Sequence, residues 1–218
     1  MQELILIGSG GCMREILWQI VELNKEQPSW DVLGYVDRQP STSHGSPDIQ
    51  VGGACCPYLG DDSYLLSGQA AANVAITVGE PGLRKKIAEN LKKNQNIHFP
   101  NLILGNAKIC SDVGMGQGCI VSMDCRVSTN VVLGDFVFLN IGAVVCHDGR
   151  IGSYTTLSPG ARTAGQVAVG QLCELGMGAN VIQGIQIGNN AIAGAGSVVV
   201  KDVEGGCTVA GVPARRIK

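Results

Sequence analysis

The sequence contains few aromatic and few charged residues. Two Trp, four Tyr and three Phe are the only rings in 218 residues, and charged side chains make up 16% of the chain, against about 25% in an average globular domain. Hydrophobic residues still account for 45%, so the composition is neither that of a disordered chain nor that of a polar tail. The chain has 31 glycines. A core that combines many glycines with few rings predicts thin, regular layers.

Other absences exclude several classes of protein. No run of 18 or more apolar residues occurs, so we expect no insertion into a membrane. Met1 leads into an apolar, strand-like segment at residues 3–7, which lacks the order of a secretory signal. A net charge of −2 provides no basic field for nucleic acid. Nine cysteines without a C-x-x-C pair indicate reduced thiols and predict a cytoplasmic protein.

From Ile103 onward the sequence repeats every six residues without a slip in register. The seventeen leading positions, up to Val199, are Val, Ile, Leu or Met except at Thr163 and Ala193. A residue that is small or β-branched stands four positions after each leader. Neither a helix nor a single strand has this period. We therefore predict an all-β parallel β-helix at residues 100–218, in which three hexads form one coil and residues 18 apart stack.

Five cysteines occupy positions of this repeat. Cys119, Cys125 and Cys173 stand four residues after a leader, and Cys110 and Cys146 stand one residue after. We interpret all five as small, buried hydrophobic fillers. Twenty of the glycines follow residue 102, where tight corners need residues that tolerate positive φ.

Residues 1–99 predict a separate α/β domain. An apolar strand at 4–7 runs into a glycine loop, and a helical pattern from Ile16 to Leu23 precedes a second strand at 32–36. Further strand and helix patterns follow at 73–78 and 83–91, the last being a helix that links to the second domain. Strand, glycine loop, helix and strand in this order predict a Rossmann-like βαβ unit with a parallel sheet.

The glycine loop is the first candidate site. Gly8, Gly10 and Gly11 at a strand-to-helix turn would let backbone N–H groups approach an anion. Asp37 closes the second strand and is placed to accept hydrogen bonds from a ribose or a base. The loop departs from the dinucleotide fingerprint, because Met13 replaces its third glycine and Asp37 comes 27 residues after Gly10 instead of about 20. A tight turn without a ligand is the alternative interpretation.

His147 is the second candidate. The chain has three histidines, and His44 and His98 lie outside the repeat. His147 and Asp148 occupy outward positions near a predicted corner, where a histidine beside an acid suits a general base. The alternative is a surface histidine on a solvated corner.

Together these motifs resemble a known family. The hexads are similar to those of the left-handed β-helix, hexapeptide-repeat acyltransferases, and so is the closing segment Ala210-Gly211-Val212-Pro213-Ala214-Arg215. Three segments resemble the sialic acid O-acetyltransferase and nucleotide-4-amino-sugar N-acetyltransferase family within that group: residues 7–11, 34–37 and 140–148. The resemblance implies left-handed coiling, which the general preference for right-handed crossovers would not predict. It implies direct acetyl transfer from acetyl-CoA to the amino group of a nucleotide-linked 4-amino-deoxy sugar, for bacterial surface glycans.

The resemblance also implies roles for particular residues. His147 matches the catalytic base, Asp148 the acid that orients it, and Gly165 a glycine whose N–H contacts the thioester, with no metal required. The other positions expected along acetyl-CoA are Thr156, Ala164 and Met177. The positions expected along the nucleotide sugar are Gly8, Gly10, Gly11, Cys12, Asp37 and Arg38. Three positions depart from the family pattern, because Cys12 and Thr156 replace histidines and Arg38 replaces an acid.

The family forms trimers, which implies a homotrimer with sites between subunits. The late basic residues that could meet CoA phosphates are Lys201, Arg215, Arg216 and Lys218. The first alternative function is a sialic acid or other sugar O-acetyltransferase, and the second is a non-catalytic nucleotide-sugar-binding β-helix protein. A γ-type carbonic anhydrase would need three zinc-binding histidines on the β-helix, where this chain has one. A serine acetyltransferase would have an all-helical N-terminal domain.

Overall fold

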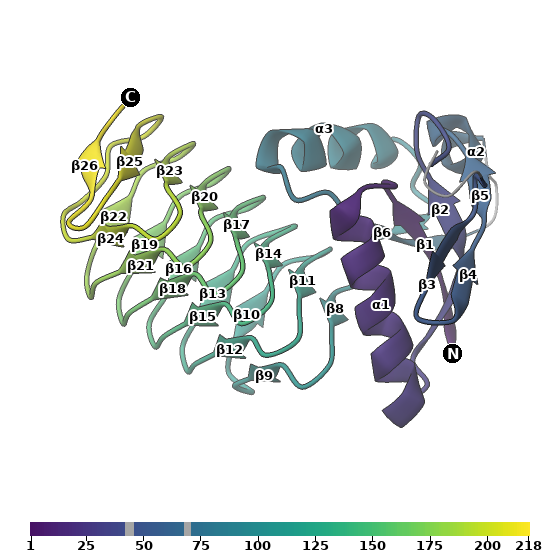
Figure 1. Cartoon of the computed structure of the whole chain (residues 1–218), viewed down its shortest axis with the longest axis horizontal. Coiled ribbons are helices and arrows are strands. Elements are labelled where there is room, and N and C mark those ends of the chain that lie inside the picture. The colour runs from purple at the N-terminus through teal and green to yellow at the C-terminus, as the bar shows by residue number, and fades with distance from the viewer. Residues whose placement is uncertain (42–45, 68–70) are drawn as a thin grey trace. The chain divides into compact units, whose positions relative to one another are not determined.

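The computed structural model describes residues 1–41, 46–67 and 71–218, so His44 lies outside the described residues. The chain divides into two compact units, Met1–Pro100 and Asn101–Lys218, whose elements are labelled in Figure 1. Of the helices in the described ranges, none combines the length and the apolar character needed to cross a bilayer.

A five-stranded parallel sheet forms the centre of the first unit, in the order β5-β2-β1-β6-β7. Its strands are β1 (Gln2–Ile7), β2 (Trp30–Val36), β5 (Tyr58–Gly60), β6 (Ala72–Ile76) and β7 (Ile97–His98). The helices of this unit are α1 (Gly11–Glu26), α2 (Asp62–Leu66) and α3 (Pro81–Leu91). A separate antiparallel pair is formed by β3 (Ile49–Val51) and β4 (Ala54–Cys56).

The strand order of this sheet determines where a ligand can bind. Helix α1 connects β1 to β2 on one side of β1, whereas β6 pairs with β1 on the other side. The carboxyl ends of β1 and β6 therefore flank the point at which the strand order reverses, where open α/β sheets bind their ligands. The backbone N–H of Thr77 donates to the carbonyl of Ile7 over 3.0 Å, and its Oγ1 donates to the same oxygen over 2.6 Å. This contact holds the two loops side by side.

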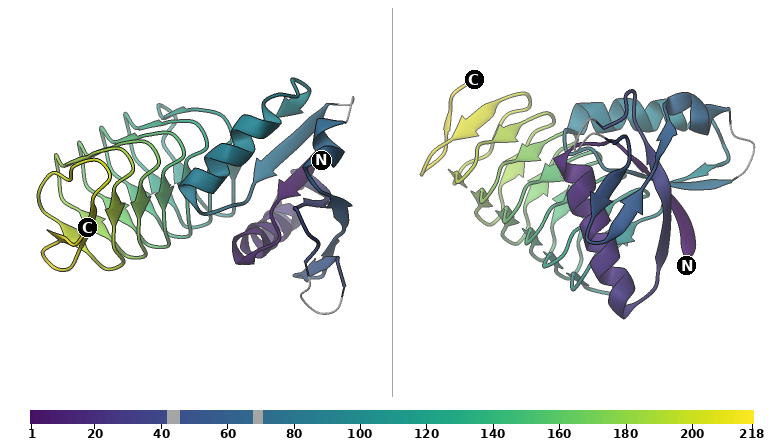
Figure 2. Two further views of the ribbon diagram at one scale, coloured as in Figure 1. Left: turned by 90° about the horizontal axis from the view of Figure 1, so that it is seen from above. Right: turned by 45° about the vertical axis from the view of Figure 1, so that its right-hand side comes forward.

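The second unit is a parallel β-helix in which each of the seventeen hexads forms a two-residue strand that ends at its leader. The strands stack into three parallel sheets, seen from two directions in Figure 2. The first sheet contains β8 (Leu102–Ile103), β11 (Ile120–Val121), β14 (Phe138–Leu139), β17 (Thr156–Leu157), β20 (Glu174–Leu175) and β23 (Ile192–Ala193). It is extended by β25 (Thr208–Ala210) and the antiparallel β26 (Arg215–Arg216).

The other two sheets share the same 18-residue register. The second sheet contains β9 (Lys108–Ile109), β12 (Arg126–Val127), β15 (Val144–Val145), β18 (Arg162–Thr163), β21 (Asn180–Val181) and β24 (Val198–Val199). The third sheet contains β10 (Gly114–Met115), β13 (Val132–Leu133), β16 (Arg150–Ile151), β19 (Ala168–Val169) and β22 (Gln186–Ile187). The coil of three hexads inferred from the sequence is thus confirmed.

The interior of the β-helix consists of stacked aliphatic side chains. The leaders Ile103, Val121, Leu139, Leu157 and Leu175, 18 residues apart, were expected to form one buried aliphatic ladder. The last four have no exposed surface, whereas Ile103, in the first coil, is exposed. Residues four positions after a leader also face inward, as the fully buried Ala143, Ala161 and Ala179 show. This arrangement leaves room for methyl groups but not for rings, which accounts for the scarcity of aromatic residues.

The interpretation of the cysteines holds for three of the five. Cys119, Cys125 and Cys173 are fully buried, as expected for fillers that follow a leader by four residues. Cys110 is exposed and Cys146 only half-buried, so the prediction that all five are buried is wrong. The position directly after a leader begins the corner of the coil, where burial varies from one coil to the next: Leu104 and Ser122 at this position are fully buried.

Candidate active site

His147 and Asp148 form the corner that connects β15 to β16. Asp148 has φ of +61°, a left-handed conformation that Asp and Asn adopt more readily than most residues. Its backbone N–H donates to the carbonyl of Thr129, one coil earlier, over 3.1 Å. Both side chains project outward, with exposed fractions of 50% for His147 and 41% for Asp148. The corner therefore presents the pair at the surface.

The two side chains form a polarised pair. Nδ1 of His147 lies 2.8 Å from Oδ2 of Asp148. Hydrogen bonds from His147 and from Asn130 hold the pKa of the Asp148 carboxyl below its usual range. An ionised carboxylate only accepts hydrogen bonds, so Nδ1 carries the hydrogen, and in the neutral form of the imidazole the lone pair then resides on Nε2. This is the tautomer that a general base needs.

Gly165 lies one coil beyond His147, directly against its ring. A Cβ at this position would overlap Cε1 and Nε2 of His147. The N–H of Gln166 donates to the carbonyl of His147 over 2.9 Å and ties the two coils together. Within the part of the chain that the structure describes, the N–H of Gly165 donates to no protein acceptor. It is therefore available to an oxygen of a ligand.

The remaining residues expected along acetyl-CoA do not all lie at this corner. Ala164 precedes Gly165 and shares its corner. Thr156, by contrast, is buried on β17 of the first sheet, and Met177 is exposed at the corner that follows β20. A single chain thus brings His147, Asp148 and the Ala164–Gly165 pair together, but it leaves Thr156 and Met177 on other parts of the β-helix.

A pocket of about 450 Å³ lies in the first unit, at the carboxyl ends of β1, β2 and β6. It is lined by all six residues expected along the nucleotide sugar: Gly8, Gly10, Gly11, Cys12, Asp37 and Arg38. The opposite side is formed by residues 77–80 and by Leu83 and Ile87 of α3, which the sequence reasoning did not single out. The sequence did contain one indication of the loop at residues 77–80: Gly79 follows the predicted strand at 73–78, as Gly8 follows the strand at 4–7.

The polar groups of this pocket are arranged around the start of α1. Ser9 Oγ donates to Oδ2 of Asp37 over 2.6 Å. Helix α1 begins at Gly11, and the residue before it, Gly10, provides no side-chain cap. The N–H groups of the first turn are therefore open to an anion. The start of α3 is different, because the carboxylate of Glu80 accepts hydrogen bonds from the first N–H groups there. Of these two helices, only α1 therefore begins with N–H groups that no capping side chain occupies.

Cys12 lines this pocket as a neutral thiol. Burial and the nearby carboxylate of Glu15 raise its pKa to about 11, against the opposing influence of Arg84. The thiolate is the nucleophilic form of cysteine, so at neutral pH Cys12 lines the pocket as an uncharged side chain that is not nucleophilic. In the described residues no group of three His, Cys, Asp or Glu side chains is placed to hold a metal ion.

The fold and the two sites together define a class. A parallel β-helix with a histidine–aspartate pair on one corner, joined to an α/β domain with an open anion loop, is typical of hexapeptide-repeat acyltransferases. Residues 3–91 match the family model described as the PglD N-terminal domain. A search among curated proteins gave no match.

Solved structures extend this match over the whole chain. PerB from Caulobacter crescentus, in complex with CoA and GDP-perosamine, is 31% identical, and the match covers 100% of this chain and 98% of PerB with a TM-score of 0.86. The acetyltransferase domain of PglB from Neisseria gonorrhoeae, in complex with acetyl coenzyme A, is 29% identical over 99% of each chain with a TM-score of 0.84. WeeI from Acinetobacter baumannii is 26% identical over 100% of each chain with a TM-score of 0.82.

The chain belongs to the hexapeptide-repeat acyltransferase family of sialic acid O-acetyltransferases and nucleotide-4-amino-sugar N-acetyltransferases. The resemblance stated from the sequence is confirmed, as is the fold class: an α/β domain with a parallel sheet, followed by a left-handed parallel β-helix. The protein is an acetyltransferase.

Proposed function

We propose that the protein transfers an acetyl group from acetyl-CoA to the amino group of a nucleotide-linked 4-amino-deoxy sugar, as a cytoplasmic step in the synthesis of a bacterial surface glycan. The observation that carries this proposal is the His147–Asp148 pair lying against Gly165 on one corner of the β-helix. The ligands of PerB, CoA and GDP-perosamine, support both substrate classes, and so does the acetyl coenzyme A held by the PglB domain.

In this proposal His147 is the general base of a direct transfer. Acetyl-CoA supplies the acetyl group as a thioester. Nε2 of His147 accepts the proton that the sugar amine loses as its nitrogen bonds to the thioester carbon, and returns that proton to sulfur as the C–S bond breaks. Asp148 keeps the hydrogen on Nδ1 and stabilises the imidazolium that forms. Such general base catalysis is worth about 10²- to 10⁴-fold in rate.

Gly165 has a separate role in the proposed reaction. Negative charge develops on the thioester oxygen as the amine attacks, and a backbone N–H that makes no other hydrogen bond is suited to donate a hydrogen bond to that oxygen. The N–H of Gly165 meets this condition among the described residues. With Ala164 before it, the corner carries no bulky side chain that would keep a thioester away.

The pocket of the first unit fits the nucleotide part of the substrate. The uncapped start of α1 suits the phosphates. Leu83 and Ile87 provide an apolar wall for a base, and Asp37 and Arg38 lie on the side where β2 ends. Its volume of about 450 Å³ falls within the usual range of roughly 300–1,000 Å³ for small-molecule sites.

The positions of Thr156 and Met177 support a site shared between chains. Neither lies on the corner of His147, which favours an arrangement in which a neighbouring subunit supplies them to the acetyl-CoA site. We propose a homotrimer with its sites between subunits. Light scattering of active protein should give three times the mass of one chain, and a monomer mass would refute the shared site.

The acceptor is identified by measuring thiol release from acetyl-CoA with a panel of nucleotide-linked amino sugars and free sialic acids. The proposal predicts release with at least one nucleotide-linked 4-amino sugar, and mass spectrometry should find the acetyl group on nitrogen. Transfer only to hydroxyl groups would instead identify a sugar O-acetyltransferase. Binding of nucleotide sugars without release from any member of the panel would indicate a non-catalytic binding protein.

A further inference from the structure

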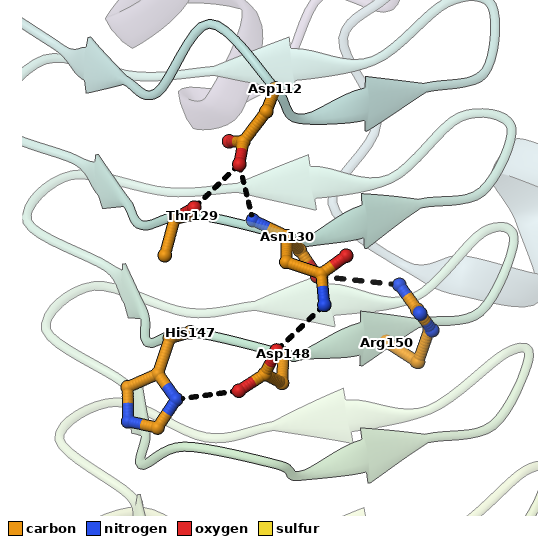
Figure 3. A network of polar contacts seen from close by, with 6 residues as sticks. All are labelled: Asp112, Thr129, Asn130, His147, Asp148 and Arg150. Atoms are coloured by element: carbon orange, nitrogen blue, oxygen red, sulfur yellow. Dashed lines mark hydrogen bonds and ion pairs between the residues drawn. The ribbon is translucent and has the colours of Figure 1, made fainter.

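A column of polar side chains runs along the corner of the β-helix that carries His147. Figure 3 shows it from Asp112, through Thr129 and Asn130 on the next coil, to the His147–Asp148 pair. Each step spans one coil, because Asp112, Asn130 and Asp148 are 18 residues apart. The column connects the proposed catalytic pair to residues that no part of the mechanism above uses.

Asn130 and His147 occupy different oxygens of the same carboxylate. Nδ2 of Asn130 donates to Oδ1 of Asp148 over 2.6 Å, whereas Oδ2 of Asp148 faces Nδ1 of His147 at 2.8 Å. An exposed carboxylate with one partner is free to rotate about its last torsion, which has broad minima. Two partners on two oxygens fix its plane, and the plane of the carboxylate in turn fixes the direction of the imidazole.

Asn130 is itself held from the coil before. Its backbone N–H donates to Oδ2 of Asp112 over 3.1 Å, and the hydroxyl of Thr129 donates to the same oxygen. The carbonyl of Asn130 accepts a hydrogen bond from Nη1 of Arg150 over 3.4 Å. With φ at +53°, Asn130 has the left-handed conformation that asparagine tolerates. Its side chain therefore starts from a fixed backbone.

We propose that Asn130 is a positioning residue for acetyl transfer, which orients the Asp148 carboxylate so that Nδ1–H of His147 is held and Nε2 is directed to the substrate. The inference rests on the proposed function of His147 as base. An amide suits this role because it donates a hydrogen bond without adding a charge next to Asp148. The charged groups around the pair are Asp112, Arg150 and Asp148 itself.

The deletion variant is Asn130→Gly, because glycine keeps the left-handed backbone without strain. We expect kcat to fall roughly 10-fold or more while KM for acetyl-CoA stays within about twofold, since small misplacements of catalytic groups are costly to the chemical step. The Asn130→Asp variant keeps the shape but replaces the donor by a negative charge. It should shift the acidic limb of the pH profile of kcat to higher pH, because added negative charge favours the imidazolium.

The β-helix offers a matched control at another corner. Nδ2 of Asn106 donates to Oδ1 of Asp124 over 2.8 Å, and the N–H of Asp124 donates back to Oδ1 of Asn106 over 2.9 Å. This pair has the same residue types and the same 18-residue step but no histidine beside it. Asn106→Gly should leave kcat and the pH profile unchanged, whatever small effect it has on stability.

A double variant tests whether Asn130 acts through Asp148. If it does, Asn130→Gly should cause no further loss of kcat in an Asp148→Ala background, because coupled residues are non-additive. Losses that multiply would overturn the proposal, and so would an Asn130→Gly protein that behaves like Asn106→Gly.

A spectroscopic measurement keeps this inference separate from the proposed function. The ¹⁵N shifts of the His147 ring report its tautomer in the full-length protein without any substrate. We expect Nδ1–H to dominate at high pH in the wild type and in Asn106→Gly, and a mixed population in Asn130→Gly. An unchanged tautomer in Asn130→Gly overturns the positioning role. A changed tautomer in a protein that acetylates no sugar would leave the positioning of His147 intact and refute the proposed function instead.

Discussion

The imidazole of His147 lies against the Cα of Gly165 on the next coil, so closely that a Cβ on Gly165 would overlap Cε1 and Nε2 of the ring. The backbone hydrogen bond from Gln166 to His147 fixes this approach. The absence of a side chain at residue 165 therefore leaves room for the imidazole of the proposed base. The backbone N–H of Gly165, which donates to no acceptor among the described residues, lies at the same corner.

The variant Gly165→Ala should displace the imidazole and lower kcat by roughly 10²-fold, since a displacement of about 1 Å can cost that much. The measurement is steady-state thiol release with the identified acceptor. Gly114→Ala is the control, because a Cβ there would meet only Cγ2 of Val132 at 3.7 Å. Equal activities of the two variants would show that the contact between His147 and Gly165 has no catalytic consequence.

Thr163 is the one hydroxyl-bearing leader in the interior of the β-helix. Its side chain is 1% exposed, and Oγ1 has no hydrogen-bond partner among the described residues. Replacing it by the isosteric valine should raise the free energy of unfolding by about 1 kcal/mol, because a buried polar group without a partner is costly. Urea denaturation of the two proteins measures the difference.

Thr155→Val is the opposite case in the same scaffold. Oγ1 of Thr155 donates to the carbonyl of Gly170 over 2.7 Å and accepts from the N–H of Cys173 over 3.1 Å. This variant should lower the free energy of unfolding by roughly 1–3 kcal/mol, since both partners lose their hydrogen bond. A stabilised Thr155→Val or a destabilised Thr163→Val would contradict the hydrogen-bond assignment.

Cys12 should resist alkylation at pH 8. Burial raises its pKa to about 11, and only the thiolate reacts with iodoacetamide. Mass spectrometry should therefore find the exposed Cys55 modified first, with the rate at Cys12 increasing as the pH approaches 11. Bound nucleotide sugar should slow the reaction at Cys12 further. Equal rates at the two cysteines at pH 8 would disprove the neutral thiol.

The Asp148 carboxylate should contribute to the free energy of unfolding at neutral pH and lose that contribution at low pH. Its folded-state pKa is lowered by hydrogen bonds from His147 and Asn130, so its contribution is present above the unfolded pKa of about 3.9 and is lost as the pH falls through the folded value. Urea midpoints of wild type and Asp148→Asn should differ at pH 5 and converge towards pH 2, as the carboxyl group is protonated. A difference that grows between pH 5 and pH 2 would contradict the lowered pKa of Asp148.

Much of the fold is contained in the sequence because the period of the β-helix is short and strict. A leader at every sixth residue fixes the strand, and an 18-residue stack follows from three strands per coil. The exposure of Cys110 and Cys146 was missed because residue type says little about a position at which the chain leaves a strand. Sequence spacing alone placed them on the repeat without showing which way they face.

The parts of the candidate site that depend on residue type and motif could be predicted from the sequence. His147, Asp148 and Gly165 were named from the sequence, and their positions as catalytic and binding residues remain predictions. Asn130 was not named, because its role depends on a hydrogen bond between coils. The 18-residue step from Asp148 was the available signal. The loop at residues 77–80 was missed for a similar reason, because only the strand order places it beside the glycine loop.

The role of His147 as general base is tested most directly by comparing His147→Ala with His98→Ala, a variant of the exposed histidine on β7. Thiol release is measured with saturating acetyl-CoA and acceptor, and binding of acetyl-CoA is measured separately by calorimetry. We predict that His147→Ala lowers kcat at least 10²-fold while acetyl-CoA still binds, and that His98→Ala has the turnover of the wild type. Near-normal turnover of His147→Ala would contradict the account.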